Sequence, residues 1–239
     1  MNLHCIGDSH ACFFLGENRI SKIYPTVETG LYKNIYCYRL GSPLAYNLIR
    51  TNSSVQAREK IFNIVKTLHS KQDVLLFSFG EVDCRAHLLK KAEELNQTYE
   101  QIVNSCVQNY LSFIREIKEM GFHIFIWNAV YSANYDASYD FEFPYYGTIE
   151  NRNTITKVFN QTLKSYQQQT GYFFIDITDS LLNESTQHSV IEYFFDEIHL
   201  NNLLFMRVVK IIRQQIPQFR PEVKFKKIIP ILICLLNSK

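Results

Sequence analysis

The sequence has little net charge and no dense run of basic residues. Its 239 residues carry a formal net charge of +2, and Lys and Arg are spread along the chain apart from a few lysines near its end. A surface that binds nucleic acid needs concentrated basic residues, because the partner is a polyanion. We therefore expect no nucleic-acid partner.

The chain also has no C-x-x-C pair and no zinc-binding pattern. Its six cysteines are scattered, and in a chain of this length such cysteines do not indicate a disulfide framework. His4, Cys5, His10 and Cys12 lie close together, but their spacing fits no zinc signature. We expect reduced, buried thiols, no metal and no organic cofactor.

No apolar segment is long enough to cross a bilayer. The first residues lack the basic and apolar regions of a secretory signal peptide, so we expect a cytoplasmic location. Near the other end, lysines precede an apolar run from Ile228 to Leu236, which contains Pro230 and is far shorter than the roughly 20 residues of a spanning helix. Residues 222–239 are predicted as a basic and apolar tail, for which peripheral membrane contact, packing onto the domain and contact with a second subunit or partner all stay open.

Apolar material is plentiful enough for a sizeable core, with 46% hydrophobic and 20% charged residues. Short apolar runs alternate with longer segments of helical periodicity, without a repeat or a linker. This alternation predicts one α/β domain over residues 1–221, a three-layer sandwich with a mostly parallel five-stranded sheet. The predicted strands are 2–6, 34–40, 73–79, 123–127 and 172–177. The predicted helices are 43–50, 55–69, 99–120, 151–168 and 201–215.

The longest predicted helix has one apolar face. Its large side chains recur at spacings of three and four, which places them on the side that packs against the sheet. Gly121 follows as a C-cap. The stripe consists of Ile102, Cys106, Tyr110, Phe113 and Ile117.

A candidate nucleophile follows the first predicted strand. Gly7-Asp8-Ser9 puts Ser9 at the carboxyl end of that strand, where open α/β sheets bind their ligands. A helix that begins there would favour negative charge through its free N–H groups, although a serine is also a common N-cap. Cys12 and Cys84 follow no such turn, which favours Ser9 over a cysteine nucleophile.

A candidate base and its partner stand near the end of the predicted domain. Asp196 precedes His199 by three residues, just before the last predicted helix. A nucleophilic serine needs an imidazole to take its proton, and the imidazole needs a carboxylate that fixes its tautomer. The pair therefore complements Ser9, whereas alone it would indicate only a turn.

These two motifs resemble the first and last blocks of the SGNH (GDSL-like) hydrolases. The resemblance implies a flavodoxin-like sandwich and a Ser9–His199–Asp196 triad. It also implies that Gly41, which follows the second predicted strand, corresponds to the glycine of the second block, whose N–H faces the oxyanion. The similarity extends from residue 7 to about residue 201.

The third block departs from the family pattern. The family's G-x-N-D reads Gly80-Glu81-Val82-Asp83 here, so the asparagine donor of the oxyanion hole is missing. Loss of one such donor costs on the order of 10²- to 10³-fold in rate. The segment is similar to a G-E-[IV]-D-C-R variant of SGNH-like proteins from bacterial surface-glycan clusters.

Three further side chains are candidates for the work of the missing asparagine or for substrate binding. Arg85 could donate to an oxyanion or to a substrate carboxylate, and Glu81 could orient Arg85 or bind sugar hydroxyls. Asn128, at the end of the fourth predicted strand, could replace the missing donor. Glu81 and Arg85 could equally form a pair with no catalytic part.

The segment from Val130 to Gly147 is rich in aromatic residues and predicts a binding loop or lid. Its rings could stack on sugars or could only pack the loop onto the body, and Asp136, Asp140 and Glu142 could bind hydroxyl groups. Together these features predict a serine ester hydrolase that removes a small acyl group, such as acetyl, from a small-molecule or glycan ester. Acyl transfer to a sugar hydroxyl by the same triad, and a glycan-binding module with impaired catalysis, stay open as alternatives.

Overall fold

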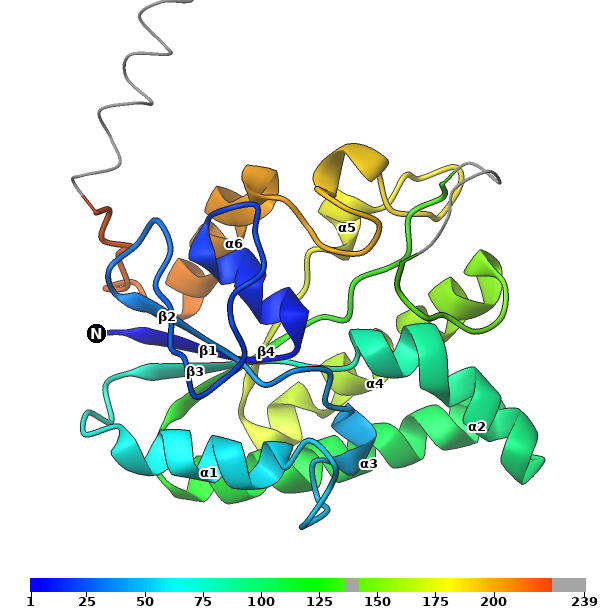
Figure 1. The fold of residues 1–239 in the computed structure, drawn as a ribbon, viewed down its shortest axis with the longest axis horizontal. Helices are drawn as coiled ribbons and strands as arrows, with labels where there is room; N and C mark the ends of the chain where they lie inside the picture. Colours follow the sequence, from blue (N-terminus) through cyan, green and yellow to red (C-terminus); the bar gives the residue numbers. More distant parts are fainter. Residues whose placement is uncertain (136–141, 225–239) are drawn as a thin grey trace, which may run out of the picture.

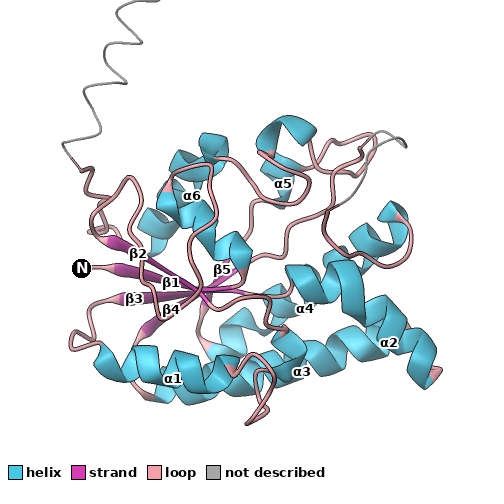
Figure 2. Cartoon of the chain, viewed as in Figure 1, coloured by secondary structure: helices cyan, strands magenta, loops and turns pink. Residues whose placement is uncertain are grey.

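A parallel five-stranded sheet forms the centre of the molecule. The computed structural model describes residues 1–135 and 142–224. The strands run in the order β2-β1-β3-β4-β5, and all neighbours pair in parallel (Figure 2). Each overlaps a predicted segment, with β1 ending one residue later than predicted, so the predicted sheet is confirmed. The strands are β1 Leu3–Gly7, β2 Ile35–Arg39, β3 Val74–Ser78, β4 His123–Trp127 and β5 Phe173–Ile175.

Helices cover both faces of the sheet, as predicted. One face carries α1 to α4, and the opposite face carries α5, α6 and the 3-10 helix η1 (Figure 1). The α-helices are α1 Ala57–Thr67, α2 Leu88–Leu95, α3 Tyr99–Glu119, α4 Ile149–Thr170, α5 Thr178–Leu181 and α6 Phe205–Gln215. The other helical turns are η1 Ser9–Leu15, η2 Ala45–Asn47, the π-helical η3 Asp83–His87, η4 Ile191–Tyr193 and η5 Asn202–Leu204.

Local signals set the ends of the long helix α3. Thr98 and Gln101 form a capping box at its start, since each side chain accepts from the backbone N–H of the other. Gly121 has a φ of 88° and donates to the carbonyl of Lys118, which closes the helix where the sequence predicts.

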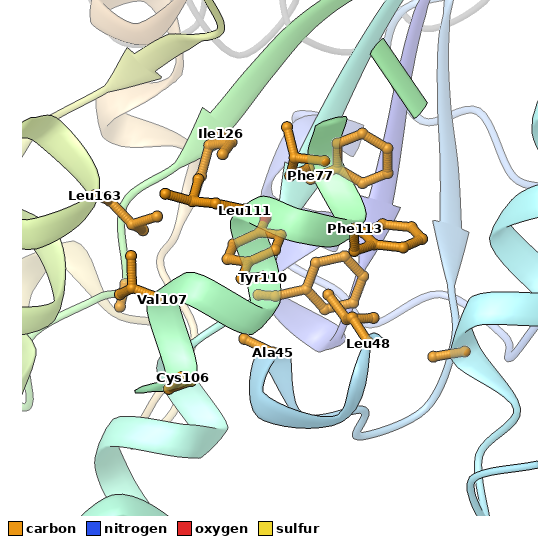
Figure 3. Close-up of a cluster of buried hydrophobic side chains, with 14 of the residues drawn as sticks. Ala45, Leu48, Phe77, Cys106, Val107, Tyr110, Leu111, Phe113, Ile126 and Leu163 are labelled. Carbon is orange, nitrogen blue, oxygen red and sulfur yellow. The ribbon is translucent and has the colours of Figure 1, made fainter. Parts of the chain in front are cut away.

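Two apolar clusters hold the three layers together. The larger one lies between the sheet and α1, α3 and α4, and Figure 3 shows its centre. All five residues of the predicted α3 stripe are buried in it. The ring of Phe113 meets the rings of Phe62 and Phe77 edge-on, each at 6.0 Å between centroids. The second cluster joins the other face of the sheet to η1, α5 and α6.

The helix predicted over residues 43–50 is wrong, because only the short turn η2 forms there. Asn47 and Leu48 close it with bonds to carbonyls three residues back. The N–H groups of Ala45 and Tyr46 are bound by the buried carboxylate of Asp83, at 2.7 and 3.1 Å. The contact with Asp83 thus takes the place of the expected helical hydrogen bonds. A further helix, α2, follows η3 at a place where the sequence analysis predicted none.

The start of the predicted tail packs against the body. Two backbone hydrogen bonds join it to the segment before β2: the N–H of Lys33 donates to the carbonyl of Glu222, and the N–H of Lys224 donates to the carbonyl of Leu31. Residues 225–239 lie outside the described residues, so contact of the tail with a membrane or a partner stays a prediction. Within the described part, no helix has the length and apolarity to cross a membrane.

The cysteines of the described chain are free and buried, as predicted. Cys12 and Cys37 approach most closely, with 4.0 Å between their sulfur atoms. Cys234 lies outside the described residues. Because no disulfide joins the described cysteines, the stability of this part of the chain comes from the two apolar clusters.

Truncation of Phe113 at the centre of the larger cluster will destabilise the fold. We expect Phe113→Ala to lower the free energy of unfolding by about 3 to 5 kcal/mol, because a fully buried ring leaves a cavity. Urea denaturation followed by circular dichroism measures the change. Asn104→Ala, at an exposed position of the same helix, is the control and should change it by less than about 0.5 kcal/mol. Equal effects of the two changes would contradict this assignment of the core.

Candidate active site

The end of β1 brings Ser9 to the carboxyl edge of the sheet. Gly7, the last residue of the strand, pairs with Arg39 of β2 and with Ser78 of β3. A side chain at Gly7 would place its Cβ 2.1 Å from the carbonyl oxygen of Ser78, so only glycine permits this approach. Asp8 then caps η1 by accepting the N–H of His10 at 2.9 Å, and Ser9 begins the helix.

The three predicted triad residues meet in one chain of hydrogen bonds. His199 Nε2 lies 2.7 Å from Ser9 Oγ, and His199 Nδ1 lies 2.7 Å from Asp196 Oδ2. The other carboxylate oxygen accepts the N–H groups of Ile198 and His199, at 3.0 and 2.7 Å. The D-x-x-H turn therefore holds its carboxylate rigidly against its own imidazole.

Burial and hydrogen bonding set the charge states of the pair. Burial is the largest influence on His199 and lowers its pKa below 6.5, although the bond to Asp196 opposes this shift. Burial alone would raise the pKa of Asp196, but the bonds from His199 and Ile198 outweigh it and lower that pKa. At neutral pH the imidazole is therefore neutral and the carboxylate is ionised, which is the state that can accept a proton from Ser9.

Two glycines flank the nucleophile on neighbouring strands. Gly41 and Gly80 each lie two residues beyond the partners of Gly7, as Ser9 lies two residues beyond Gly7 itself. Their φ values of 103° and 108° are in the region that favours glycine. Between described residues, no hydrogen bond uses the N–H of Ser9 or of Gly41. These two groups are therefore candidates to receive an oxyanion.

The third block contributes no side-chain donor at the asparagine position. Val82 has an apolar side chain, and Asp83 accepts the N–H groups of η2. Asn128 is fully buried and joins the ends of β4 and β5: its amide nitrogen donates to the carbonyl of Ala129 at 3.0 Å, and its amide oxygen accepts from Ile177 at 3.4 Å. Its role as a replacement donor stays a prediction.

Glu81 and Arg85 form a buried pair beside the triad. Arg85 Nε donates to Glu81 Oε1 at 2.6 Å, and its Nη1 donates to the carbonyl of Pro144. Arg85 is thus bound on two sides within the chain, and Glu81 orients it as one interpretation of the sequence requires. Burial of Glu81 leaves it little access to sugar hydroxyls. His10 Nε2 lies 3.1 Å from Glu81 Oε2, a contact that the sequence analysis missed.

Aromatic rings enclose His199. The ring of Phe143 meets it edge-on at 5.4 Å between centroids, and the ring of Phe195 stacks on it at 5.8 Å. The buried Glu197 accepts the N–H of Phe143 at 2.7 Å and so ties the aromatic segment to the D-x-x-H turn. Phe195 and Glu197 flank Asp196 in the sequence, but nothing in their pattern distinguished them from packing residues.

The aromatic segment therefore reaches the candidate site through Phe143. Of the three carboxylates predicted to bind hydroxyl groups there, Glu142 is exposed. Asp136 and Asp140 lie outside the described residues, as do Tyr139 and Phe141. Their role stays a prediction.

A cavity lined mostly by polar residues lies at the same edge of the sheet but apart from the triad. Its volume is about 450 Å³, and it lies beyond β4 and β5, between α4 and residues 186–188. Amide, hydroxyl, carboxylate and ammonium groups line it, among them Asn153, Lys157, Lys164, Asp176, Gln187 and His188. Among the described residues, no group of three or more His, Cys, Asp or Glu side chains is placed to hold a metal ion.

Solved structures share this architecture, whereas no protein-family model and no curated protein matches the sequence. A carbohydrate acetylesterase from Sinorhizobium meliloti has a TM-score of 0.52 and 12% identity, over 90% of this chain and 98% of that one. A lipase/acylhydrolase from Enterococcus faecalis has a TM-score of 0.52 and 14% identity, over 94% and 100%. A catalytic mutant of an acetylxylan esterase from Geobacillus stearothermophilus has a TM-score of 0.51 and 16% identity, over 93% and 96%.

Matches at these identities establish the fold and leave the reaction to be argued from the site. The described residues span nearly the whole length of each matched chain, so the likeness covers a complete domain. The chain therefore has the α/β fold of the SGNH hydrolases, the family that its motifs resemble.

Proposed function

We propose that the protein is a serine-dependent ester hydrolase that removes a small acyl group, such as acetyl, from a carbohydrate. The hydrogen-bond chain from Ser9 through His199 to Asp196 carries this proposal. A serine bound to a neutral, carboxylate-oriented imidazole is an activated nucleophile for acyl transfer. The fold, shared with esterases and acylhydrolases, supports the same reaction class.

Each member of the chain has a defined task. Ser9 Oγ attacks the ester carbonyl carbon while His199 Nε2 takes its proton, and the N–H groups of Ser9 and Gly41 receive the negative oxygen. His199 then gives the proton to the departing alcohol, which leaves an acyl group on Ser9. Water attacks this acyl-enzyme with His199 again as base, releasing the acid and restoring Ser9.

The carbohydrate part of the proposal is supported by two observations. Two of the matched structures are a carbohydrate acetylesterase and an acetylxylan esterase. In this chain, the 450 Å³ cavity offers the mixture of amide, hydroxyl and charged groups that binds sugar hydroxyls. It lies beyond β5, three strand spacings from β1, or roughly 14 Å. An oligosaccharide can span this distance while its ester group reaches Ser9.

Removal of the nucleophile will abolish hydrolysis. We expect Ser9→Ala to lower kcat/KM for p-nitrophenyl acetate by at least about 10³-fold, because no other group in the hydrogen-bond chain can form the acyl-enzyme. Release of p-nitrophenol measures the rate, and unchanged circular dichroism shows that the variant folds. Equal rates for the two proteins would contradict the proposed mechanism and favour a binding module.

Activity will rise with pH through the ionisation of His199. The base must be neutral to act, and its folded pKa lies below 6.5, so we expect protonation to suppress kcat/KM only in the acidic range. The rate should be fully developed at neutral pH. A profile of kcat/KM between about pH 4 and pH 9 measures this acidic limb. An inflection above the ordinary pKa of histidine would contradict the assigned environment.

Filling the cavity will weaken action on an oligosaccharide without changing simple ester hydrolysis. Thr154 is exposed and lines the cavity, so Thr154→Trp should raise KM for an acetylated xylo-oligosaccharide about tenfold, or about 1.4 kcal/mol. Hydrolysis of p-nitrophenyl acetate should be unchanged. Ser165→Trp, an exposed position on the same helix that does not line the cavity, is the matched control. An unchanged KM in Thr154→Trp would exclude the cavity as a glycan site.

A further inference from the structure

We propose that His10 is a positioning residue of the reaction, held as a cation by the Glu81 carboxylate that Arg85 orients, and acting on Ser9 and His199 through its charge. This inference rests on the proposed ester hydrolysis and deepens it. It gives a function to a buried charged cluster that the triad does not use.

The cluster is continuous and almost closed to water. Arg85 Nε lies 2.6 Å from one oxygen of Glu81, and His10 Nε2 lies 3.1 Å from the other. The exposed fractions of Arg85, Glu81 and His10 are 8, 6 and 4%. On its other side, the His10 ring lies 5.1 Å from the ring of His199, between centroids. The cluster thus extends from the end of β3 to the base of the triad.

The charges of the cluster leave a positive balance beside Ser9. Four groups face His10, namely Asp8, Glu81, Arg85 and His199. Burial would lower the pKa of His10, and so would Arg85, but Glu81 and Asp8 outweigh both, and the net shift is upward. Burial raises the pKa of Asp8 to about 7, so this carboxyl group is partly protonated at neutral pH. With His10 protonated, two cations thus face one fully ionised carboxylate, Glu81, and one partly ionised carboxyl group, Asp8.

Glu81 stays ionised despite its position. Burial would raise its pKa, but Arg85 and His10 outweigh burial and hold the pKa at about 2. A buried carboxylate costs stability unless it is paired. Here Glu81 Oε2 and His10 Nε2 lie 3.1 Å apart and neither atom has a hydrogen bond within the described residues, so their ion pair fixes where the positive charge of His10 lies.

A fixed cation at this place compensates for the missing asparagine. An oriented charge in a site closed to water stabilises a negative oxygen without rearranging during the reaction. The position of the lost donor is Val82, and Glu81 and Arg85 belong to the same short motif. The segment from Gly80 to Arg85 therefore lacks the asparagine donor of the oxyanion hole but supplies the Glu81–Arg85 pair that holds His10 in place.

The cation also acts on the base. A positive charge near His199 lowers its pKa, which keeps the imidazole neutral and able to accept a proton. The Glu81–Arg85 pair is also connected to His199 through the chain. Arg85 Nη1 donates to the carbonyl of Pro144, which follows Phe143, and the ring of Phe143 packs on His199. Loss of His10 should thus change both the rate and its pH dependence.

The test compares His10→Gln, Glu81→Gln and the double variant by their pH profiles with p-nitrophenyl acetate. We expect each single change to lower kcat/KM about 10- to 100-fold and the double variant to be no slower, since either change removes the same cation. In His10→Gln the acidic limb should move to higher pH, because His199 holds its proton more tightly without the neighbouring charge.

A matched control comes from the other end of the same strands. His4 is buried in β1 and lies 3.4 Å from Asp73, which precedes β3, so His4→Gln disturbs a similar pair far from Ser9. This variant should keep the native profile. Nitrogen NMR of the unmodified protein should show the His10 ring as an imidazolium at neutral pH, which tests the charge without any substitution.

The outcomes separate this inference from the function on which it rests. An unchanged rate, or a lower rate with an unshifted acidic limb, in His10→Gln would overturn the role of His10 while an inactive Ser9→Ala upheld ester hydrolysis. A neutral His10 ring in the NMR experiment would overturn it too. Full activity of Ser9→Ala would instead refute the hydrolase mechanism itself.

Discussion

The pairing of β1 with both of its neighbours at Gly7 determines the geometry of the site. Because Gly7 has no side chain, its backbone lies directly beside Ser78, and the same register holds it beside Arg39. Two residues further along, Ser9, Gly41 and Gly80 each follow the carboxyl end of one of three neighbouring strands. The nucleophile and its candidate oxyanion donors are thus products of strand register, and a slip of one residue would separate them.

Buried charge is concentrated around this edge of the sheet. Asp83 binds the N–H groups of η2, Glu81 binds Arg85 and approaches His10, and Asp196 binds its own turn and His199. Asp83 and Glu81 are buried, and Asp196 is partly buried, at a cost that their partners offset. These carboxylates orient an imidazole or hold a loop in place. The apolar clusters elsewhere in the molecule supply the stability that offsets their burial.

The site has two parts that serve different needs. His199 packs against the rings of Phe143 and Phe195, and its burial lowers its pKa, which keeps the imidazole neutral. The polar cavity beyond β5 is wide and lined by groups suited to hydroxyl-rich ligands. A reaction on an ester group of a larger, polar molecule would use both parts, with chemistry at β1 and recognition toward β4 and β5.

The sequence by itself determined the sheet, most helices and the three residues of the Ser9–His199–Asp196 hydrogen-bond chain, because apolar periodicity and short motifs reflect local physical rules. The strands and the α3 stripe followed from spacing, and Ser9, Asp196 and His199 from chemical necessity and the family resemblance. Only the tertiary structure decided the rest. It replaced the helix predicted at residues 43–50 with a turn bound to Asp83, assigned Asn128 to the backbone and brought His10 to Glu81. These outcomes depend on contacts between segments that lie far apart in the chain, and no local pattern records which partner a buried polar group will meet.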